Sequence, residues 1–156
     1  MTVVQDEMKM ISLPCHPRHL KKAREFVSNI LGDIEVSNKE RFAIELSLDE
    51  ASMNAIDHGS AINAEMHFDI RCGLRNGKLI LLIKDYGGKP FDPNYFEKLA
   101  GKKSWGYGGR GISIIKQLMD EVMYSFHKGE STTVCMIKQL TSISSPAADN
   151  QAEEDW

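Results

Sequence analysis

An alternating stretch followed by a tight turn constrains this fold more than any other feature of the sequence. From residue 64 to 74, apolar side chains occupy every second position, and polar side chains occupy the positions between them. Asn76 and Gly77 follow, a dipeptide that favours a two-residue hairpin turn, and 79–84 is again strand-like. The chain is therefore expected to contain a half-buried antiparallel hairpin.

Helices and further strands are expected on both sides of this hairpin. Residues 8–13 resemble a strand that ends at Pro14, and 18–31 have helical spacing before Gly32. Ser37 and Glu40 form a capping-box pair that begins a helix expected to run to about residue 58, with Gly59 as its left-handed stop. Another helix is expected at 111–120, and a last hairpin at 121–127 and 132–140. This order predicts an α+β fold, a two-layer sandwich with a mixed, mostly antiparallel sheet and helices on one face.

Composition limits the functions open to the chain. Its 156 residues suit a single domain, expected over 1–143, and the acidic residues 144–156 are expected to form a disordered tail. The net charge of −3 argues against direct nucleic-acid binding. Three widely separated cysteines without a C-x-x-C pair indicate reduced thiols, and no apolar run resembles a leader or a membrane span. A cytoplasmic protein is expected.

The second expected helix carries polar residues in an unusual place. Glu50 and Asn54 are one turn apart and lie on a narrow strip between two apolar stripes. An amide oxygen suits magnesium, which keeps waters and phosphates among its ligands, and a carboxylate one turn away can accept a proton. Solvated surface positions would explain the same two residues equally well.

Asp85 closes an apolar strand and is followed by Gly87 and Gly88. A carboxylate at the bottom of an apolar slot can accept a hydrogen bond from an exocyclic amine, and the glycines would let a ligand approach the backbone. An aspartate that simply begins a turn is the more common explanation of such a position.

A glycine-rich segment precedes the expected helix at 111–120, after a long aperiodic stretch. It comprises Gly106, Gly108, Gly109, Arg110, Gly111 and Ile112. Backbone amides at a helix N-terminus bind anions, and an arginine adds positive charge. The glycine spacing matches a dinucleotide-binding fingerprint by letter, but no strand precedes it, and the stretch around Gly101 lacks the residues of a P-loop.

The three segments in this order resemble the ATPase superfamily shared by gyrase, histidine kinases and the MutL repair proteins, the histidine-kinase-like or GHKL type. The sequence is more closely similar to the anti-sigma-factor serine kinases of the RsbW and SpoIIAB kind, over roughly residues 8–140. This resemblance implies ATP and Mg²⁺ as cofactors, Glu50 as the catalytic base, Asn54 as the magnesium ligand and Asp85 as the adenine reader.

The resemblance also implies roles for other residues. The remaining nucleotide-binding residues would be Gly87, Gly88, Gly106, Gly108, Gly109, Arg110, Gly111, Ile112, Thr132 and Thr133, although Ser131 stands where the family usually has glycine. The implied function is that of a serine kinase that binds a sigma factor and phosphorylates a small anti-anti-sigma (STAS) protein, as a homodimer.

Two alternatives remain open. The chain could be a non-catalytic module that sequesters a partner and uses ATP only to order its lid. The catalytic half of a two-component sensor is disfavoured because no phospho-accepting histidine lies on a long dimerisation helix. His58 is interpreted as a structural residue near a helix cap.

Overall fold

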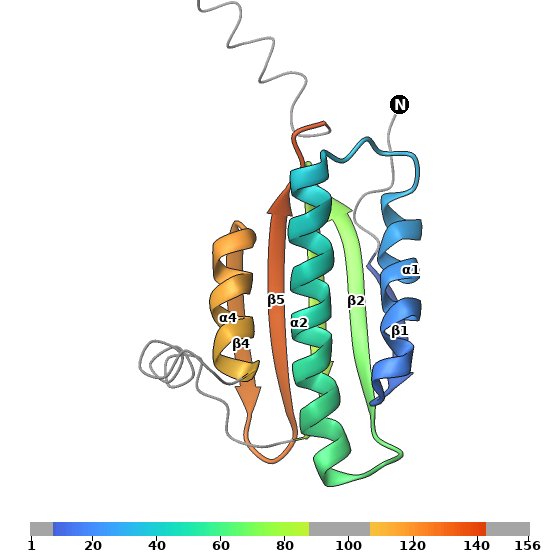
Figure 1. The fold of residues 1–156 in the computed structure, drawn as a ribbon, viewed down its shortest axis with the longest axis vertical. Helices are drawn as coiled ribbons and strands as arrows, with labels where there is room; N and C mark the ends of the chain where they lie inside the picture. The colour runs from blue at the N-terminus through green and yellow to red at the C-terminus, as the bar shows by residue number, and fades with distance from the viewer. Residues whose placement is uncertain (1–7, 88–106, 143–156) are drawn as a thin grey trace, which may run out of the picture.

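A computed structural model describes residues 8–87 and 107–142, and in residues 107–112 it describes the backbone alone. Three α-helices and five strands follow one another along the described chain (Figure 1). The elements are β1 (Lys9–Pro14), the 3-10 turn η1 (Pro17–His19), α1 (Leu20–Leu31), α2 (Asn38–Ile62), β2 (His67–Arg75), β3 (Lys78–Asp85), α4 (Tyr107–Leu118), β4 (Glu121–His127) and β5 (Ser131–Gln139). The expected tail lies outside the described residues.

The strands form one five-stranded sheet in the order β1-β2-β3-β5-β4. The central hairpin is confirmed: Arg75 pairs with Lys78, and Asn76 and Gly77 have φ angles of 51° and 76°, as a type I′ turn requires. All four strand pairings are antiparallel, so the expected mixture with parallel pairs is wrong for the described sheet. The pairs β2–β3 and β4–β5 are hairpins, which are antiparallel by nature. The other two pairs, β1–β2 and β3–β5, also run antiparallel.

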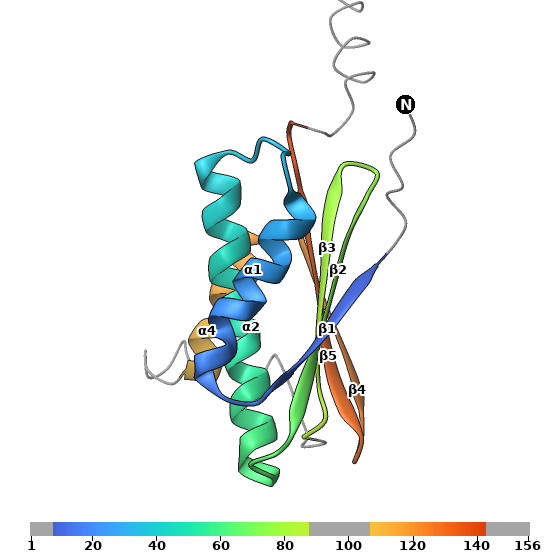
Figure 2. The same ribbon diagram turned by 90° about the vertical axis from the view of Figure 1, so that its right-hand side faces the viewer.

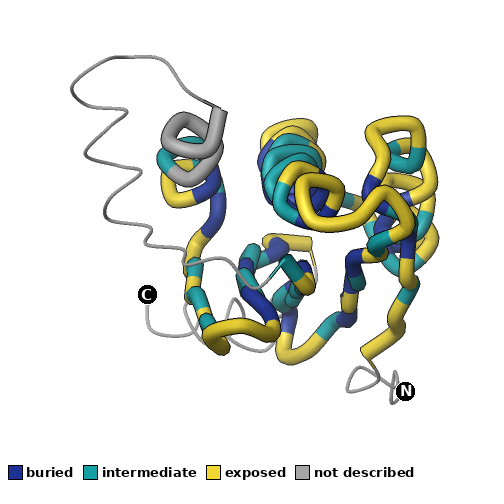
Figure 3. Tube along the Cα trace, turned by 90° about the horizontal axis from the view of Figure 1, so that it is seen from below, coloured by how far each residue is buried: buried dark blue, intermediate teal, exposed yellow. Residues whose placement is uncertain are grey.

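The helices cover one face of the sheet, which confirms the expected two-layer α+β sandwich (Figure 2). The core lies between the layers, where Ile44, Leu48 and Ile56 of α2 meet Phe68, Ile70, Leu81 and Met136 of the sheet, all fully or almost fully buried. Seen from below, buried segments lie between helices and sheet, and exposed segments face outward (Figure 3). Within the described residues no helix covers the opposite face of the sheet.

Helix α2 is longer than expected, and Gly59 does not end it. The capping box is present, since the Ser37 hydroxyl accepts from the Glu40 N–H at 3.0 Å and Glu40 Oε1 accepts from the Ser37 N–H at 3.1 Å. The helix continues to Ile62. Gly59 is required for space instead, because a Cβ atom there would lie 2.4 Å from the Cys15 sulfur.

The other helix starts also differ from expectation. The turn that begins at Pro17 is a 3-10 turn, and α1 itself starts at Leu20. Helix α4 starts at Tyr107, before the expected start at Gly111, so most of the glycine-rich segment is helical and not loop. Glycine tolerates both states in a first turn, which is why composition alone misplaced this boundary.

Candidate functional site

A cavity of about 340 Å³, including the space open to solvent, lies between helices α2 and α4 and the end of the sheet near Asp85. Its walls are mainly apolar, and its polar groups come from separate elements. It is lined by Ala51, Asn54, Ala55 and His58 of α2, Ile83 and Asp85 of β3, Ile115 of α4, Tyr124 of β4, and Thr132 and Val134 of β5. This combination of an apolar slot with few convergent polar groups is typical of small-molecule sites.

Asp85 is the buried charge of the cavity. It is 6% exposed and ends β3, where its backbone pairs with Phe68 on one side and Thr132 on the other. Its Oδ1 accepts the backbone N–H of Gly87 at 3.1 Å, and its Oδ2 lies 3.3 Å from His58 Nδ1. Both oxygens are therefore oriented by neighbours, and each retains capacity to accept a further hydrogen bond from a ligand.

Gly87 lies directly against the end of helix α2. A Cβ atom at this position would be 3.0 Å from the His58 carbonyl oxygen and 3.2 Å from the His58 Cβ. The absence of a side chain at Gly87 thus lets the chain leaving β3 pass close to the helix, and it keeps the Gly87 N–H within reach of Asp85.

Asn54 and Glu50 lie one turn apart on α2, but the cavity includes Asn54 alone. Glu50 is half-buried beside it, and its pKa is raised, first by burial and second by the charge of Asp49. Asp49 in turn forms a two-point ion pair with Arg24, with distances of 2.9 and 2.6 Å. A raised pKa makes Glu50 a stronger base when it is deprotonated.

The two threonines of β5 lie on opposite faces of the sheet. Thr132 lines the cavity across from Asp85. Thr133 pairs with Lys84 and Ser125, so alternation along the strand directs its side chain to the face that no described helix covers. The structure therefore brings Thr132 to the site and keeps Thr133 away from it.

The glycine-rich residues are placed only in part. Gly88 and Gly106 lie outside the described residues, and Gly108, Gly109, Arg110, Gly111 and Ile112 fall in the first turns of α4, where the backbone alone is described. Helix α4 packs beside α2 and contributes Ile115 to the cavity. The glycine-rich residues in the first turns of α4 therefore belong to the same helix that contributes Ile115 to the cavity wall.

Sequence reasoning missed His58, Tyr124, Ile115 and Val134 as cavity residues. The expected helix stop at Gly59 places His58 near a helix cap, whereas α2 continues to Ile62. The sequence does place Asp57 or His58 on the helix strip of Glu50 and Asn54, because His58 is four residues after Asn54, but it gives no indication that His58 contacts Asp85. Tyr124 and Val134 depend on strand pairing and could not be found from local pattern.

Neither a metal cluster nor a membrane span is found in the described part of the chain. Residues 8–87 and 107–142 contain no group of three or more histidine, cysteine, aspartate or glutamate side chains that could hold a metal ion. No helix among them is long and apolar enough to cross a membrane.

Comparisons with known proteins show which family the chain belongs to. The family model of the histidine kinase-like ATPase domain matches residues 13–138. Serine-protein kinase RsbW of Bacillus subtilis is 26% identical over 145 residues, 86% of this chain and 84% of that protein. Serine-protein kinase RsbW of Bacillus licheniformis is 26% identical over 134 residues, 81% of this chain and 82% of that protein.

A solved structure has the same fold. The crystal structure of the RsbU and RsbW domains of Rv1364c from Mycobacterium tuberculosis superposes with a TM-score of 0.61 at 17% identity. The match covers 86% of this chain and 32% of that longer one. Because this family model spans most of its length, the chain belongs to the histidine kinase-like ATPase domain family.

Proposed function

We propose that this protein binds ATP in the cavity beside Asp85 and transfers the γ-phosphoryl group to a serine of a partner protein. The observation that carries the proposal is the buried carboxylate of Asp85, held by Gly87 and His58 at the end of an apolar slot that also contains Asn54. The similarity to serine-protein kinases over more than four fifths of both chains supports phosphoryl transfer as the reaction.

The adenine ring would enter the slot between α2, α4 and the sheet. Ala55, Ile83, Ile115 and Val134 offer apolar surface to the ring faces. Asp85 can accept a hydrogen bond from the 6-amino group, which guanine lacks at this position. Thr132, opposite Asp85 in the sheet, can donate or accept a further bond.

The phosphates would lie toward Asn54 and the glycine-rich segment. The amide oxygen of Asn54 fits Mg²⁺, which prefers few protein oxygens together with waters and phosphates. When bound, the ion would neutralise negative charge on the phosphates. The free backbone amides in the first turn of α4, which includes Gly108 and Gly109, would bind phosphate oxygens beside Arg110.

Glu50 would act as the base. Its half-buried carboxylate, with a raised pKa, can accept the proton of an incoming serine hydroxyl as that oxygen attacks phosphorus. Most of the acceleration would come from positioning and charge neutralisation, because phosphoryl transfer needs little covalent help.

The proposed role is that of an anti-sigma factor in partner switching in the cytoplasm. The protein would sequester a sigma factor, and it would phosphorylate a serine of a STAS-type anti-anti-sigma protein. The nucleotide would determine which partner is held. A homodimer is proposed as well, and the face that no described helix covers carries half-buried Ile80, Leu82 and Ile137, an apolar surface suited to such contacts.

The test is phosphoryl transfer from labelled ATP to the cognate anti-anti-sigma protein, with nucleotide binding measured in parallel. Glu50→Ala should keep ATP binding within about threefold and reduce transfer by at least about a hundredfold, because the base acts in the transition state. Glu45→Ala is the control, since Glu45 is exposed on the same helix and pairs with Arg41 at 3.8 Å.

Either of two results would contradict the assignment. Normal transfer by Glu50→Ala would remove this residue from the mechanism. Tight ATP binding by the wild-type protein without any label on the partner would instead support a non-catalytic module that sequesters its partner.

A further inference from the structure

We propose that His58 is a positioning residue that fixes the Asp85 carboxylate in the orientation in which it recognises the 6-amino group of adenine. The inference rests on the proposed function, since it concerns the same nucleotide site. It adds a residue that determines selectivity among purine nucleotides.

The contact between the two side chains has a defined direction. His58 Nδ1 lies 3.3 Å from Asp85 Oδ2. An ionised carboxylate can only accept hydrogen bonds, so Nδ1 must carry the proton and donate it. With Gly87 donating to Oδ1, the carboxylate is held at both oxygens, and its plane is set by one donor from α2 and one from the chain after β3.

The packing around His58 limits the freedom of this arrangement. The His58 side chain is 24% exposed and the Asp85 side chain 8%, so the pair is mostly withdrawn from water. The backbone of His58 also lies so close to Gly87 that a Cβ there would make a tight contact, 3.0 Å from the His58 carbonyl oxygen. His58 therefore contacts Asp85 through its ring and lies against Gly87 through its carbonyl group.

A buried carboxylate depends on such donors. Burying a charge without partners is costly, and a carboxylate that loses one donor can rotate toward another neighbour or toward water. Cys15 lies near Asp85, but its thiol is directed to the carbonyl oxygen of Ala55 at 3.8 Å. Without the His58 donor, the Asp85 carboxylate would rotate and its Oδ2 atom would move. Asp85 would then no longer be oriented to accept a hydrogen bond from an exocyclic amine.

A purely structural histidine would behave differently from a positioning one. If His58 only filled space in α2, its replacement would weaken the binding of every nucleotide that enters the slot by a similar factor. If it orients Asp85, the loss should depend on the 6-amino group. The ratio of affinities for two nucleotides that differ at this one substituent therefore distinguishes the two roles.

The experiment measures dissociation constants for ATP and for purine riboside triphosphate, which has hydrogen in place of the 6-amino group. His58→Leu should weaken ATP binding about tenfold and purine riboside triphosphate binding less than about twofold, as expected for one hydrogen bond to a charged group. His58→Asn should restore most of the ATP preference, because its amide nitrogen can stand where Nδ1 stands. His58→Gln, whose donor lies further out, should not.

Two further variants make the result specific. His67→Leu is the matched control, since His67 is exposed at the start of β2 and contacts the Glu65 carbonyl oxygen, and it should change neither affinity. Asp85→Asn should abolish the preference for ATP, which tests the adenine reader itself. Thermal melting of each variant establishes that it is folded, and the Asn and Gln variants decide the question if His58→Leu does not fold.

The outcomes separate this inference from the proposed function. Equal losses for both nucleotides in His58→Leu, or equal behaviour of the Asn and Gln variants, would overturn the positioning role while Asp85→Asn still loses its preference. An Asp85→Asn protein that keeps the wild-type preference would overturn the adenine-reading role itself, and the inference with it.

Discussion

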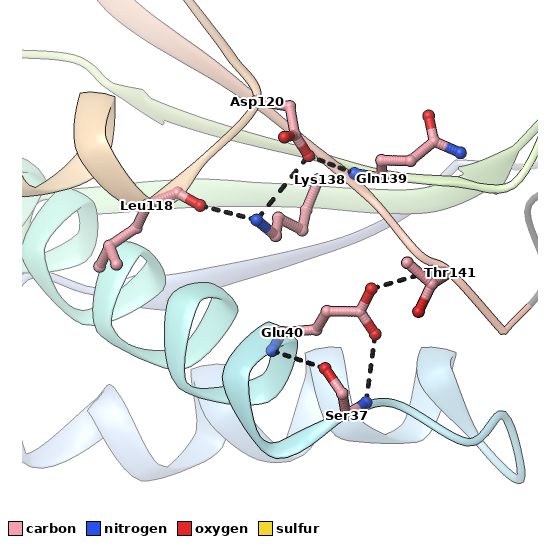
Figure 4. Close-up of polar contacts among 7 residues, drawn as sticks. All are labelled: Ser37, Glu40, Leu118, Asp120, Lys138, Gln139 and Thr141. Carbon is pink, nitrogen blue, oxygen red and sulfur yellow. Dashed lines mark hydrogen bonds and ion pairs between the residues drawn. The ribbon is translucent and has the colours of Figure 1, made fainter.

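Replacing Glu40 with glutamine should destabilise the protein. The Glu40 carboxylate is 6% exposed and joins two parts of the chain that are distant in sequence. Its Oε1 accepts the Ser37 N–H at 3.1 Å, and its Oε2 accepts the Thr141 N–H at 2.9 Å (Figure 4). It thereby fixes the start of α2 to the segment that follows β5.

The size of the effect follows from these bonds. Glutamine keeps the shape of the side chain, and its one carbonyl oxygen can serve one N–H group while its NH₂ group opposes the other. The protein loses one charge-assisted hydrogen bond and weakens a second, which costs about 2 kcal/mol. For a chain of this length that lowers the melting temperature by roughly 6 °C.

The pH dependence gives an independent check. Burial alone would raise the pKa of Glu40, but the hydrogen bonds from Thr141 and Ser37 outweigh it and the pKa is lowered. A lowered pKa in the folded state contributes stability above the unfolded value of 4.5 and loses it as the pH falls through the folded value. The stability gap between wild type and Glu40→Gln should therefore be greatest near neutral pH and shrink in acid.

The assay is urea unfolding followed by circular dichroism at several pH values, with Glu45→Gln as the control. Glu45 is exposed on the same helix and should change stability by less than about 0.5 kcal/mol. A Glu40→Gln protein as stable as wild type at neutral pH, or a gap that does not depend on pH, would refute the reasoning.

Two other predictions concern space and thiol chemistry. Gly87→Ala should weaken ATP binding by about tenfold in calorimetric titration, because its Cβ would press on the backbone of His58 in α2 and displace the strand end; unchanged binding would contradict the tight contact. At pH 8, an alkylating reagent should label Cys135 first. Burial, and then the charge of Asp85, raises the pKa of Cys15 to about 11, so little thiolate forms there. Rapid labelling of more than one thiol in the folded protein would contradict this prediction.

Local pattern was enough to predict most of the secondary structure. The alternation at 64–74 and the Asn76-Gly77 turn depend on neighbours in sequence, and the capping box at Ser37 depends on residues three apart, so each could be identified directly. Gly59 could not be interpreted in the same way. Its role is set by Cys15, which reaches the helix through tertiary packing and has no signature at position 59.

The site was predictable to the extent that its residues share an element. Asn54 was found because it lies on a helix face between apolar stripes, and Asp85 because it ends an apolar strand. Thr132 was identified from the family resemblance together with Thr133, and only the register of β5 against β3 shows that one of them faces the cavity. The partnership of His58 with Asp85 joins two elements and needed the fold to become visible.

Helix α2 is held by a side-chain contact near each end. The distance between these contacts along the helix is similar to the distance between their partners along the sheet. Glu40 binds the chain beyond β5 near the N-terminus of the helix, and His58 binds Asp85 near its C-terminus. The helix between these residues is about 27 Å long at 1.5 Å per residue, and the chain from Thr132 in β5 to Thr141, two residues beyond the end of β5, covers at most about 30 Å. Because the two lengths are similar, both contacts can form together. The adenine-recognising end of the site is thus built on a helix and a sheet held in register, which is the kind of support that precise hydrogen-bond selection requires.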